Sequence, residues 1–233
     1  MLVRKLVLFD IDGTLLWTDG AGRRAIRRAL LEEMGTTGPI EGYRFDGKTD
    51  PQIIEELLTA AGHPDASHRE RHELVCRRYV ELLAAELERS PGRTKLYAGV
   101  EELLRRLEER GDALVGLLTG NLAAGAELKL RAAGLDPGRF RVGAFGSDAA
   151  ERWRLPAIAV ERAVPLMGRP VRGRDLVIVG DTPADMTCGR QLDARAIGVA
   201  TGSFTVRELL EAGAFAAFES FADPEPVLSA IYA

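Results

Sequence analysis

The stretch KLVLFDIDGT, residues 5–14, decides how the rest of the chain is interpreted. Its first half is a short apolar run without polar alternation, which is typical of a strand buried on both faces of a parallel sheet. The run ends in Asp10, and a second carboxylate, Asp12, follows two residues later with Gly13 and Thr14 behind it. We therefore predict a strand over residues 5–10 that carries two acids to its carboxyl end.

Further apolar runs repeat this pattern along the chain. LVGLL at residues 114–118 and LVIV at residues 176–179 are the clearest, and residues 196–199 and 216–218 are shorter candidates. Segments with helical periodicity lie between them, at residues 100–110, 122–133, 155–164, 183–192 and 205–212. Strands that alternate with helices in this rhythm form a parallel sheet covered by helices. The sequence therefore predicts an α/β fold with a Rossmann-like parallel sheet as its core.

One long helical stretch interrupts the alternation. After Asp10 the next clear buried strand begins near Leu114, and the residues between are rich in arginine, glutamate and regularly spaced leucine. Helices are expected there at residues 22–33, 51–61 and 67–89. We predict that residues 17–93 form an inserted α-helical cap domain, and that residues 1–16 and 94–233 form the core. The joints, near residues 16–18 and 90–94, are expected to act as hinges of a rigid lid.

Composition and charge narrow the possible partners. The chain has 233 residues, of which 46% are hydrophobic, 28% charged and 6% aromatic, with a net charge of −4. This balance argues against nucleic acid as a partner, and no apolar run reaches the roughly 20 residues that a membrane helix needs. Cys76 and Cys188 lie far apart and are interpreted as reduced thiols. Because no signal peptide is recognised, we expect a cytoplasmic protein; its oligomeric state is not indicated.

Polar segments follow each of the three strongest apolar runs: DIDGT at residues 10–14, TGN at residues 119–121 and GDTPAD at residues 180–185. Ligands of open parallel sheets bind at the carboxyl ends of the strands, so neighbouring strands would bring these segments together. Clustered carboxylates repel one another and stay ionised beside a cation, and oxygen ligands suit Mg²⁺ bound together with a phosphate. Helix or turn capping would explain one such loop, but the three together favour a Mg²⁺ site.

These segments resemble the motifs of the haloacid dehalogenase superfamily of aspartate-nucleophile hydrolases. The first motif, DxDGT after a hydrophobic strand, matches residues 10–14; the second, a strand that ends in Thr or Ser, matches Thr119; and the fourth, GDxxxD, matches residues 180–185. The motifs follow the family's order and span almost the whole chain. The helical insert lies where the phosphoglycolate phosphatase and β-phosphoglucomutase-like branch carries its cap, so the resemblance implies the same architecture.

The resemblance also implies a role for each motif. Asp10 would attack phosphorus and form an aspartyl-phosphate, while Asp12 would protonate the leaving alcohol and later deprotonate the attacking water. The phosphoryl oxygens would be bound by Thr119 and by the neighbouring groups of Gly120 and Asn121. The metal, Mg²⁺, would be held by Asp10, by the backbone carbonyl of Asp12 and by Asp181, with Asp185 beside them.

The third motif of the family, a lysine ahead of the fourth motif, has no match, because residues 146–179 contain no lysine. Two other cations can take its place: Arg152, at the expected start of the 155–164 helix, and Lys129, on the helix after Thr119. Either would neutralise the phosphate and orient Asp10, although arginine and lysine differ in geometry. The sequence leaves both assignments open.

Two segments of the cap are expected to face the site. In GKTD, residues 47–50, Thr49 or Asp50 can cap the following helix, which explains Asp50 and leaves Lys48 to contact the substrate. In GAGRRA, residues 20–25, the glycines fit a loose dinucleotide-binding fingerprint, but they do not follow a strand directly. We interpret them instead as the start of a helix at the cap hinge, with its N–H groups toward the site.

The predicted function is a Mg²⁺-dependent phosphatase that hydrolyses a small phosphorylated metabolite. A phosphomutase of the same superfamily is the alternative, since it uses the same residues and differs in how well the closed cap excludes water. A carbon–halogen hydrolase would need neither Asp12 nor Mg²⁺. A non-catalytic binding module on this fold would be expected to lose Asp10, Asp12 or Asp181, and all three are present.

Overall fold

The computed structural model describes residues 3–89 and 91–233, and within them six strands form one parallel sheet. The strand order is β5-β4-β1-β6-β7-β8. In that order the strands span Val142–Phe145, Ala113–Thr119, Lys5–Phe9, Leu176–Gly180, Arg195–Val199 and Ala216–Phe218. The predicted α/β fold with a parallel sheet is therefore confirmed, and β1 lies between β4 and β6, the strands formed by the other two clearest apolar runs.

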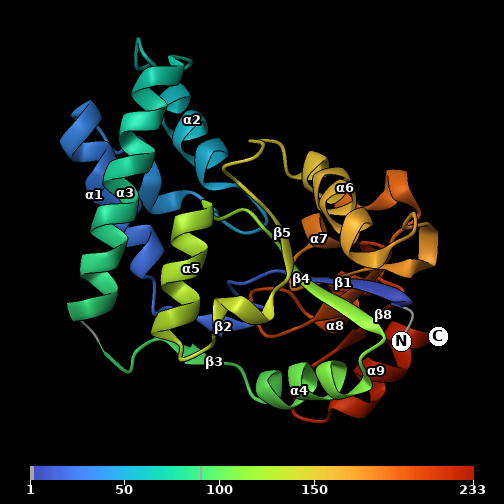
Figure 1. The fold of residues 1–233 in the computed structure, drawn as a ribbon. Helices are drawn as coiled ribbons and strands as arrows, with labels where there is room; N and C mark the ends of the chain where they lie inside the picture. Colours follow the sequence, from blue (N-terminus) through green and yellow to red (C-terminus); the bar gives the residue numbers. More distant parts are fainter. Residues whose placement is uncertain (1–2, 90) are drawn as a thin grey trace.

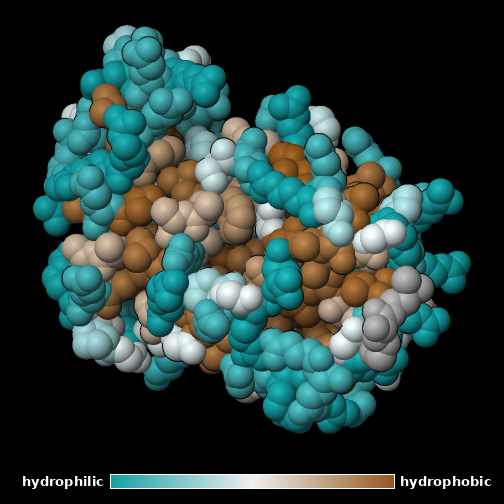
Figure 2. Space-filling model, in the orientation of Figure 1, coloured by the Kyte–Doolittle hydropathy of each residue, from teal (hydrophilic) through white to brown (hydrophobic). Residues whose placement is uncertain are grey.

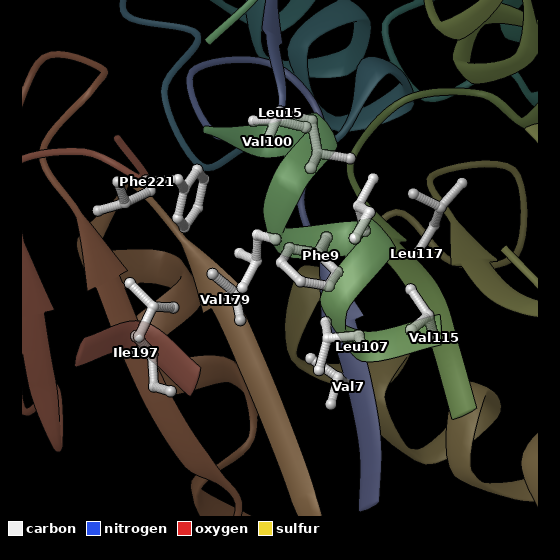
Figure 3. Close-up of a cluster of buried hydrophobic side chains, with 14 of the residues drawn as sticks. Val7, Phe9, Leu15, Val100, Leu107, Val115, Leu117, Val179, Ile197 and Phe221 are labelled. Carbon is white, nitrogen blue, oxygen red and sulfur yellow. The ribbon is translucent and has the colours of Figure 1, made fainter. Parts of the chain in front are cut away.

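The central position of β1 follows from its composition. All five of its residues are buried, and successive side chains point to opposite faces of the sheet. Val7 and Phe9 join a cluster on one face with Val115, Leu117 and residues of the neighbouring helices (Figure 3). Leu6 and Leu8 join the cluster on the other face. A strand without a polar face is stable only where helices cover both sides, because each buried Leu, Val or Phe contributes roughly 1.5–3 kcal/mol.

Helices cover both faces of the sheet (Figure 1). On one face lie α4 (Val100–Arg110), α5 (Ala123–Ala132) and α9 (Pro224–Tyr232), which supply side chains to the cluster around Phe9. On the other lie α6 (Leu155–Met167) and α7 (Pro183–Cys188), while α8 (Val206–Glu211) packs beside β7 and β8. Short 3₁₀ turns span Ile40–Gly42 (η1), Pro137–Arg139 (η2), Arg152–Arg154 (η3), Gly173–Asp175 (η4) and Arg190–Leu192 (η5).

Three helices between β1 and β4 form a separate group, the cap helices: α1 (Ala21–Met34), α2 (Asp50–Ala60) and α3 (Arg69–Arg89). They stand together at the left of Figure 1 and enclose a hydrophobic cluster of their own, which also includes Leu122, just before α5, and Leu128, within α5. Their outer surfaces are hydrophilic in Figure 2, whereas hydrophobic residues gather in the middle of that face. No helix within the described residues is long and apolar enough to cross a membrane.

The two joints of the cap helices lie side by side. Leu16–Trp17 (β2) and Lys95–Leu96 (β3) pair as a two-stranded antiparallel ribbon, in which Leu16 faces Leu96 and Trp17 faces Lys95. Ser90, the first residue of the second predicted hinge, lies outside the described residues. The ribbon places both expected hinges at one corner of the sheet, which is the arrangement that a lid moving as one body requires. The exact division into residues 17–93 and the core stays a prediction.

Candidate active site

The three polar segments meet at one edge of the sheet because β4, β1 and β6 are neighbours. Asp10 follows β1, Thr119 ends β4 and Asp181 follows β6, and all three line a cavity of about 850 Å³ between the sheet and the cap helices. Carboxylate oxygens of Asp10, Asp181 and Asp185 lie within 4.8 Å of one another. The side chain of Asp12 is not part of this group, so its expected contribution through the backbone carbonyl stays a prediction.

Burial dominates the electrostatics of this carboxylate group. It raises the pKa of the Asp10 carboxyl to about 6; Arg152 opposes the shift, and the neighbouring Asp185 adds to it. The pKa of Asp181 is also raised well above its usual value, by burial first and then by Asp185 and Asp10. Both shifts reflect the cost of burying a carboxylate, to which the repulsion between neighbouring carboxylates adds. A divalent cation with a preference for oxygen ligands would relieve that repulsion, so these residues fit Mg²⁺.

Two threonines and a glycine fix the position of Asp181. The hydroxyl of Thr14 donates to Asp181 Oδ1 over 2.9 Å, and the hydroxyl of Thr201 donates to the carbonyl of Gly13 over 2.5 Å. Gly13 adopts φ +81°, and a Cβ there would lie 2.2 Å from Asp181 Oδ2. Only glycine therefore allows the loop after β1 to approach Asp181, which explains the Gly-Thr pair of the DxDGT segment.

Arg152 is the cation that contacts Asp10. It lies on η3 and is only 6% exposed, and its Nη2 is 3.3 Å from Asp10 Oδ2 and also donates to Asp185 Oδ1. The other oxygen of Asp185 accepts from the backbone N–H and the hydroxyl of Thr182, at 3.1 and 2.6 Å, and so caps α7. Both oxygens of Asp185 therefore already have protein partners, and one effect of Asp185 is to orient Arg152 toward Asp10.

Lys129, the other candidate cation, contacts Asp12 instead. It lies on α5 with 4% of its surface exposed, and its Nζ is 2.6 Å from Asp12 Oδ2 and 2.5 Å from Asn121 Oδ1. The amide of Asn121 donates to the same oxygen of Asp12 over 2.8 Å, and to the hydroxyl oxygen of Thr119 over 2.8 Å. Two donors thus share Asp12 Oδ2, and no partner within the described residues binds Asp12 Oδ1.

The loop at residues 47–50 lies against the core, over the motif that ends β4. The backbone N–H of Asp50 donates to the carbonyl of Gly120 over 2.8 Å, and Asp50 Oδ2 accepts from the N–H of Leu122 over 2.9 Å. The hydroxyl of Thr49 donates to the carbonyl of Ala150 over 2.6 Å and also caps α2. Of the two residues expected to cap α2, Thr49 is the cap, whereas Asp50 is the first residue of α2 and binds the N–H of Leu122 just ahead of α5.

Lys48 lines the same cavity, but its ammonium group is engaged within the cap. Its Nζ is 2.5 Å from Glu56 Oε2 and 2.9 Å from the hydroxyl oxygen of Tyr43, and it lies 4.2 Å from the centre of the Tyr43 ring. A contact between Lys48 and a substrate would have to compete with Glu56. The contact between Lys48 and the substrate therefore stays a prediction, and Glu56 is the group with which the substrate would compete for Lys48.

The fold brings several residues to the site for which the sequence analysis predicted no role. Thr14 and Thr201 support the Asp181 loop, and Tyr79 lines the cavity from the middle of α3. Thr14 carries a usable signal, because it closes the DxDGT segment. Tyr79 carries none, because a tyrosine at a helical core position is ordinarily a packing residue.

Together, the parallel sheet, the carboxylates at its strand ends and the helices above them form the arrangement of an α/β hydrolase whose candidate active site is lined by acidic side chains. A family model described as haloacid dehalogenase-like hydrolase matches residues 7–190. This match covers most of the chain, so the protein belongs to the haloacid dehalogenase-like hydrolase family. The resemblance found in the sequence motifs is thereby confirmed.

Curated relatives include a phosphoglycolate phosphatase from Cereibacter sphaeroides, 34% identical over 128 residues, which are 53% of this chain and 54% of the relative. Protein CbbY from Rhodobacter capsulatus is 28% identical over 174 residues, 71% of this chain and 73% of the relative. The match to the phosphatase thus spans about half the length of that relative.

Solved structures share the fold over nearly the whole chain. A hydrolase from Pseudomonas syringae has a TM-score of 0.74 at 21% identity, covering 97% of this chain and 98% of that one. A putative β-phosphoglucomutase from Thermotoga maritima has a TM-score of 0.61 at 22% identity, covering 97% of this chain and 98% of that one. At these identities the likeness establishes the architecture, and the activity has to be argued from the site.

Proposed function

We propose that this protein is a Mg²⁺-dependent phosphatase that hydrolyses a small phosphorylated metabolite through an aspartyl-phosphate on Asp10. The observation that carries the proposal is the position of Asp10, between the carboxylate group that fits a metal ion and the guanidinium of Arg152. Membership of the hydrolase family and the phosphatase among the relatives support it. The cavity of about 850 Å³, closed on one side by the cap helices, suits a metabolite rather than a folded protein substrate.

The reaction divides into two displacements at phosphorus. In the first, an oxygen of Asp10 forms a bond to phosphorus while the bond to the ester oxygen breaks, and Asp12 gives its proton to the leaving alkoxide. In the second, water forms a bond to phosphorus while the bond to Asp10 breaks, and Asp12 takes the water's proton. Because Lys129 and Asn121 hold Asp12 Oδ2, the unpartnered Oδ1 is the atom that carries the proton.

Positive charge is needed because an anionic nucleophile has to approach an anionic ester. Arg152 provides one charge beside Asp10. A metal ion held by Asp10 and Asp181 would add the charge stabilisation that phosphoryl transfer requires. We assign the binding of the phosphoryl oxygens to the hydroxyl of Thr119 and the backbone N–H groups of Gly120 and Asn121, because these residues line the cavity at the end of β4. The N–H of Asn121, which lies 3.4 Å from Thr119 Oγ1, would exchange that long contact for a phosphoryl oxygen.

Phosphate release should therefore depend on a divalent cation. We expect EDTA to abolish turnover of small phosphate esters and added Mg²⁺ to restore it, because the carboxylate group cannot otherwise face a phosphoryl dianion. The test is a screen of phosphorylated metabolites for inorganic phosphate, with p-nitrophenyl phosphate included and each reaction run with and without the chelator. Full turnover in metal-free buffer would contradict the proposal, and transfer of the phosphoryl group to a second hydroxyl without phosphate release would favour a phosphomutase.

A second prediction concerns the contact between the loop at residues 47–50 and Gly120. A Cβ on Gly120 would lie 2.1 Å from the carbonyl oxygen of Lys48, so Gly120→Ala should push the 47–50 loop off the site. We expect at least a roughly tenfold loss of turnover, because misplacing the closed lid by about an ångström is costly. The thermal midpoint should change little, and Gly42→Ala, where a Cβ meets no atom within 4 Å, is the matched control. Wild-type turnover in Gly120→Ala would show that docking of this loop is not needed.

A further inference from the structure

One corner of the cavity holds a buried hydroxyl group with no partner. Tyr79, on α3, is 0% exposed and lines the cavity, yet its hydroxyl makes no hydrogen bond within the described residues. Buried polar groups without a partner are rare in folded proteins, because they have lost water and gained nothing in return. Burial, then the nearby carboxylates of Asp50 and Asp12, and last a weak interaction of the hydroxyl with the Asp50 side chain that falls short of a regular hydrogen bond, raise the pKa of Tyr79, so the hydroxyl keeps its proton and can donate it.

The first turn of α1 opens into the same corner. A Cβ placed on Gly22 would lie 3.5 Å from Lys129 Nζ and 3.6 Å from the hydroxyl oxygen of Tyr79, so the three residues meet. The helix has 14 residues, no side-chain cap at Gly20 and no acid in its first turn. Within the described residues no acceptor binds the N–H groups of Gly22 and Arg23. The start of α1 therefore offers unpaired donors where Tyr79 also lacks a partner.

The charged residues of the corner have unused capacity as well. Lys129 has three protons, of which two go to Asp12 and Asn121. Asp50 Oδ2 accepts from Leu122, and the Tyr79 hydroxyl lies close to this carboxylate but does not form a regular hydrogen bond with it. The corner thus offers donors on one side and a carboxylate acceptor on the other.

The balance of charge decides which group fits. Lys129 is already paired with Asp12, and Asp50 adds a second negative charge beside it. A further anion, such as a substrate carboxylate, would be repelled here. A neutral group that both donates and accepts hydrogen bonds would satisfy Tyr79, Lys129 and Asp50 together, and an alcohol hydroxyl is the simplest such group.

We propose that this corner, formed by Tyr79, Asp50, Lys129 and the first turn of α1, binds a hydroxyl group on the carbon chain of the substrate. The proposal rests on the phosphatase function argued above and narrows it to the phosphate esters of polyols or sugars. Two cations of the cap helices and loops, Lys48 and Arg23, line the same cavity. Lys48 forms an ion pair with Glu56, and Arg23 donates to the carbonyls of Ile40 and Tyr43.

The test compares three esters that differ only beyond the phosphate: glycerol 3-phosphate, which carries hydroxyls, phosphoglycolate, which carries a carboxylate, and ethyl phosphate, which carries neither. For the wild-type protein we expect kcat/KM for glycerol 3-phosphate to exceed that of each of the others by at least about tenfold, the scale of one or two hydrogen bonds. A preference for phosphoglycolate, or no preference among the three, would overturn the inference.

Tyr79→Phe removes only the hydroxyl and keeps the ring in place. We expect it to lower kcat/KM for glycerol 3-phosphate about tenfold and to leave ethyl phosphate and p-nitrophenyl phosphate unchanged. Tyr232→Phe is the matched control, because its hydroxyl donates to Asp112 away from the cavity. Equal losses on all esters would assign Tyr79 to packing of the cap and contradict the inference. Absence of phosphate release from every ester, p-nitrophenyl phosphate included, would instead refute the phosphatase function, and the inference would fall with it.

Discussion

Asp10→Asn is expected to abolish phosphate release, with a loss of at least ~10⁴-fold in kcat, the scale seen when a covalent nucleophile is removed. The amide keeps the shape of the side chain but cannot form the covalent bond to phosphorus. Asp10 is buried beside Asp181 and Asp185, and its pKa is raised to about 6. Removal of one charge from this group should therefore keep or raise the thermal midpoint, so that loss of activity cannot be ascribed to unfolding.

The exposed Asp136 offers the control for this variant. Its Oδ1 accepts from the N–H of Gly138, and an asparagine can do the same, so Asp136→Asn should have wild-type activity and stability. Phosphate release by Asp10→Asn within tenfold of wild type would contradict the assignment of the nucleophile. Activity that returns slowly with storage would have to be checked for deamidation by peptide mass.

Arg152→Ala is expected to cost at least about a hundredfold in kcat, the scale for loss of a charged donor to the transition state. Arg152 contacts both Asp10 and Asp185, and nothing else within the described residues is paired with Asp10 as a cation. The substitution also leaves two buried carboxylates without their partner, which typically destabilises a protein by about 3–5 kcal/mol. Thermal melts must therefore accompany the kinetics.

Two further variants separate chemistry from stability at this position. Arg152→Lys keeps a positive charge near Asp10 and should restore part of the lost turnover, although it cannot reproduce the geometry of the guanidinium. Arg154→Ala removes the exposed arginine of the same turn, which lies 3.7 Å from Glu151 and over the ring of the exposed Trp153, away from Asp10, and should behave like wild type. If a folded Arg152→Ala variant turns over normally, the cation that replaces the third-motif lysine is not Arg152.

The parts of the fold that could be predicted are those whose residues act locally. The strands β1, β4 and β6 are buried on both faces, so each contains an uninterrupted apolar run that stands out in the sequence. Strand β5 was missed, because Val142–Phe145 is short, contains a glycine and lies at the edge of the sheet. Helix α9 was missed as well, since its first turn contains two prolines, which a periodicity argument treats as breaks.

The two candidate cations show why the site was harder to predict than the fold. Arg152 and Lys129 are 23 positions apart, one at the start of an expected helix and one within a helix, and only the folded arrangement decides which of them reaches Asp10. In the folded chain Arg152 contacts Asp10. Lys129 contacts Asp12 instead, and it lies on α5, a helix that also packs against α3 of the cap. The engagement of Lys48 by Glu56 and the meeting of Gly22 with Tyr79 likewise depend on tertiary contacts between cap segments.

Covalent capture of the intermediate tests the central claim most directly. The Asp12→Asn variant, in which attack of water is slowed because its base is missing, should be mixed with p-nitrophenyl phosphate, whose leaving group needs little help from an acid. The reaction is then quenched in acid, and the peptides are analysed by mass spectrometry. We predict one added phosphoryl group, on Asp10 and on no other side chain, in an amount that falls when Mg²⁺ is removed. A phosphoryl group on another residue, or none on a protein that still releases p-nitrophenol, would contradict the account.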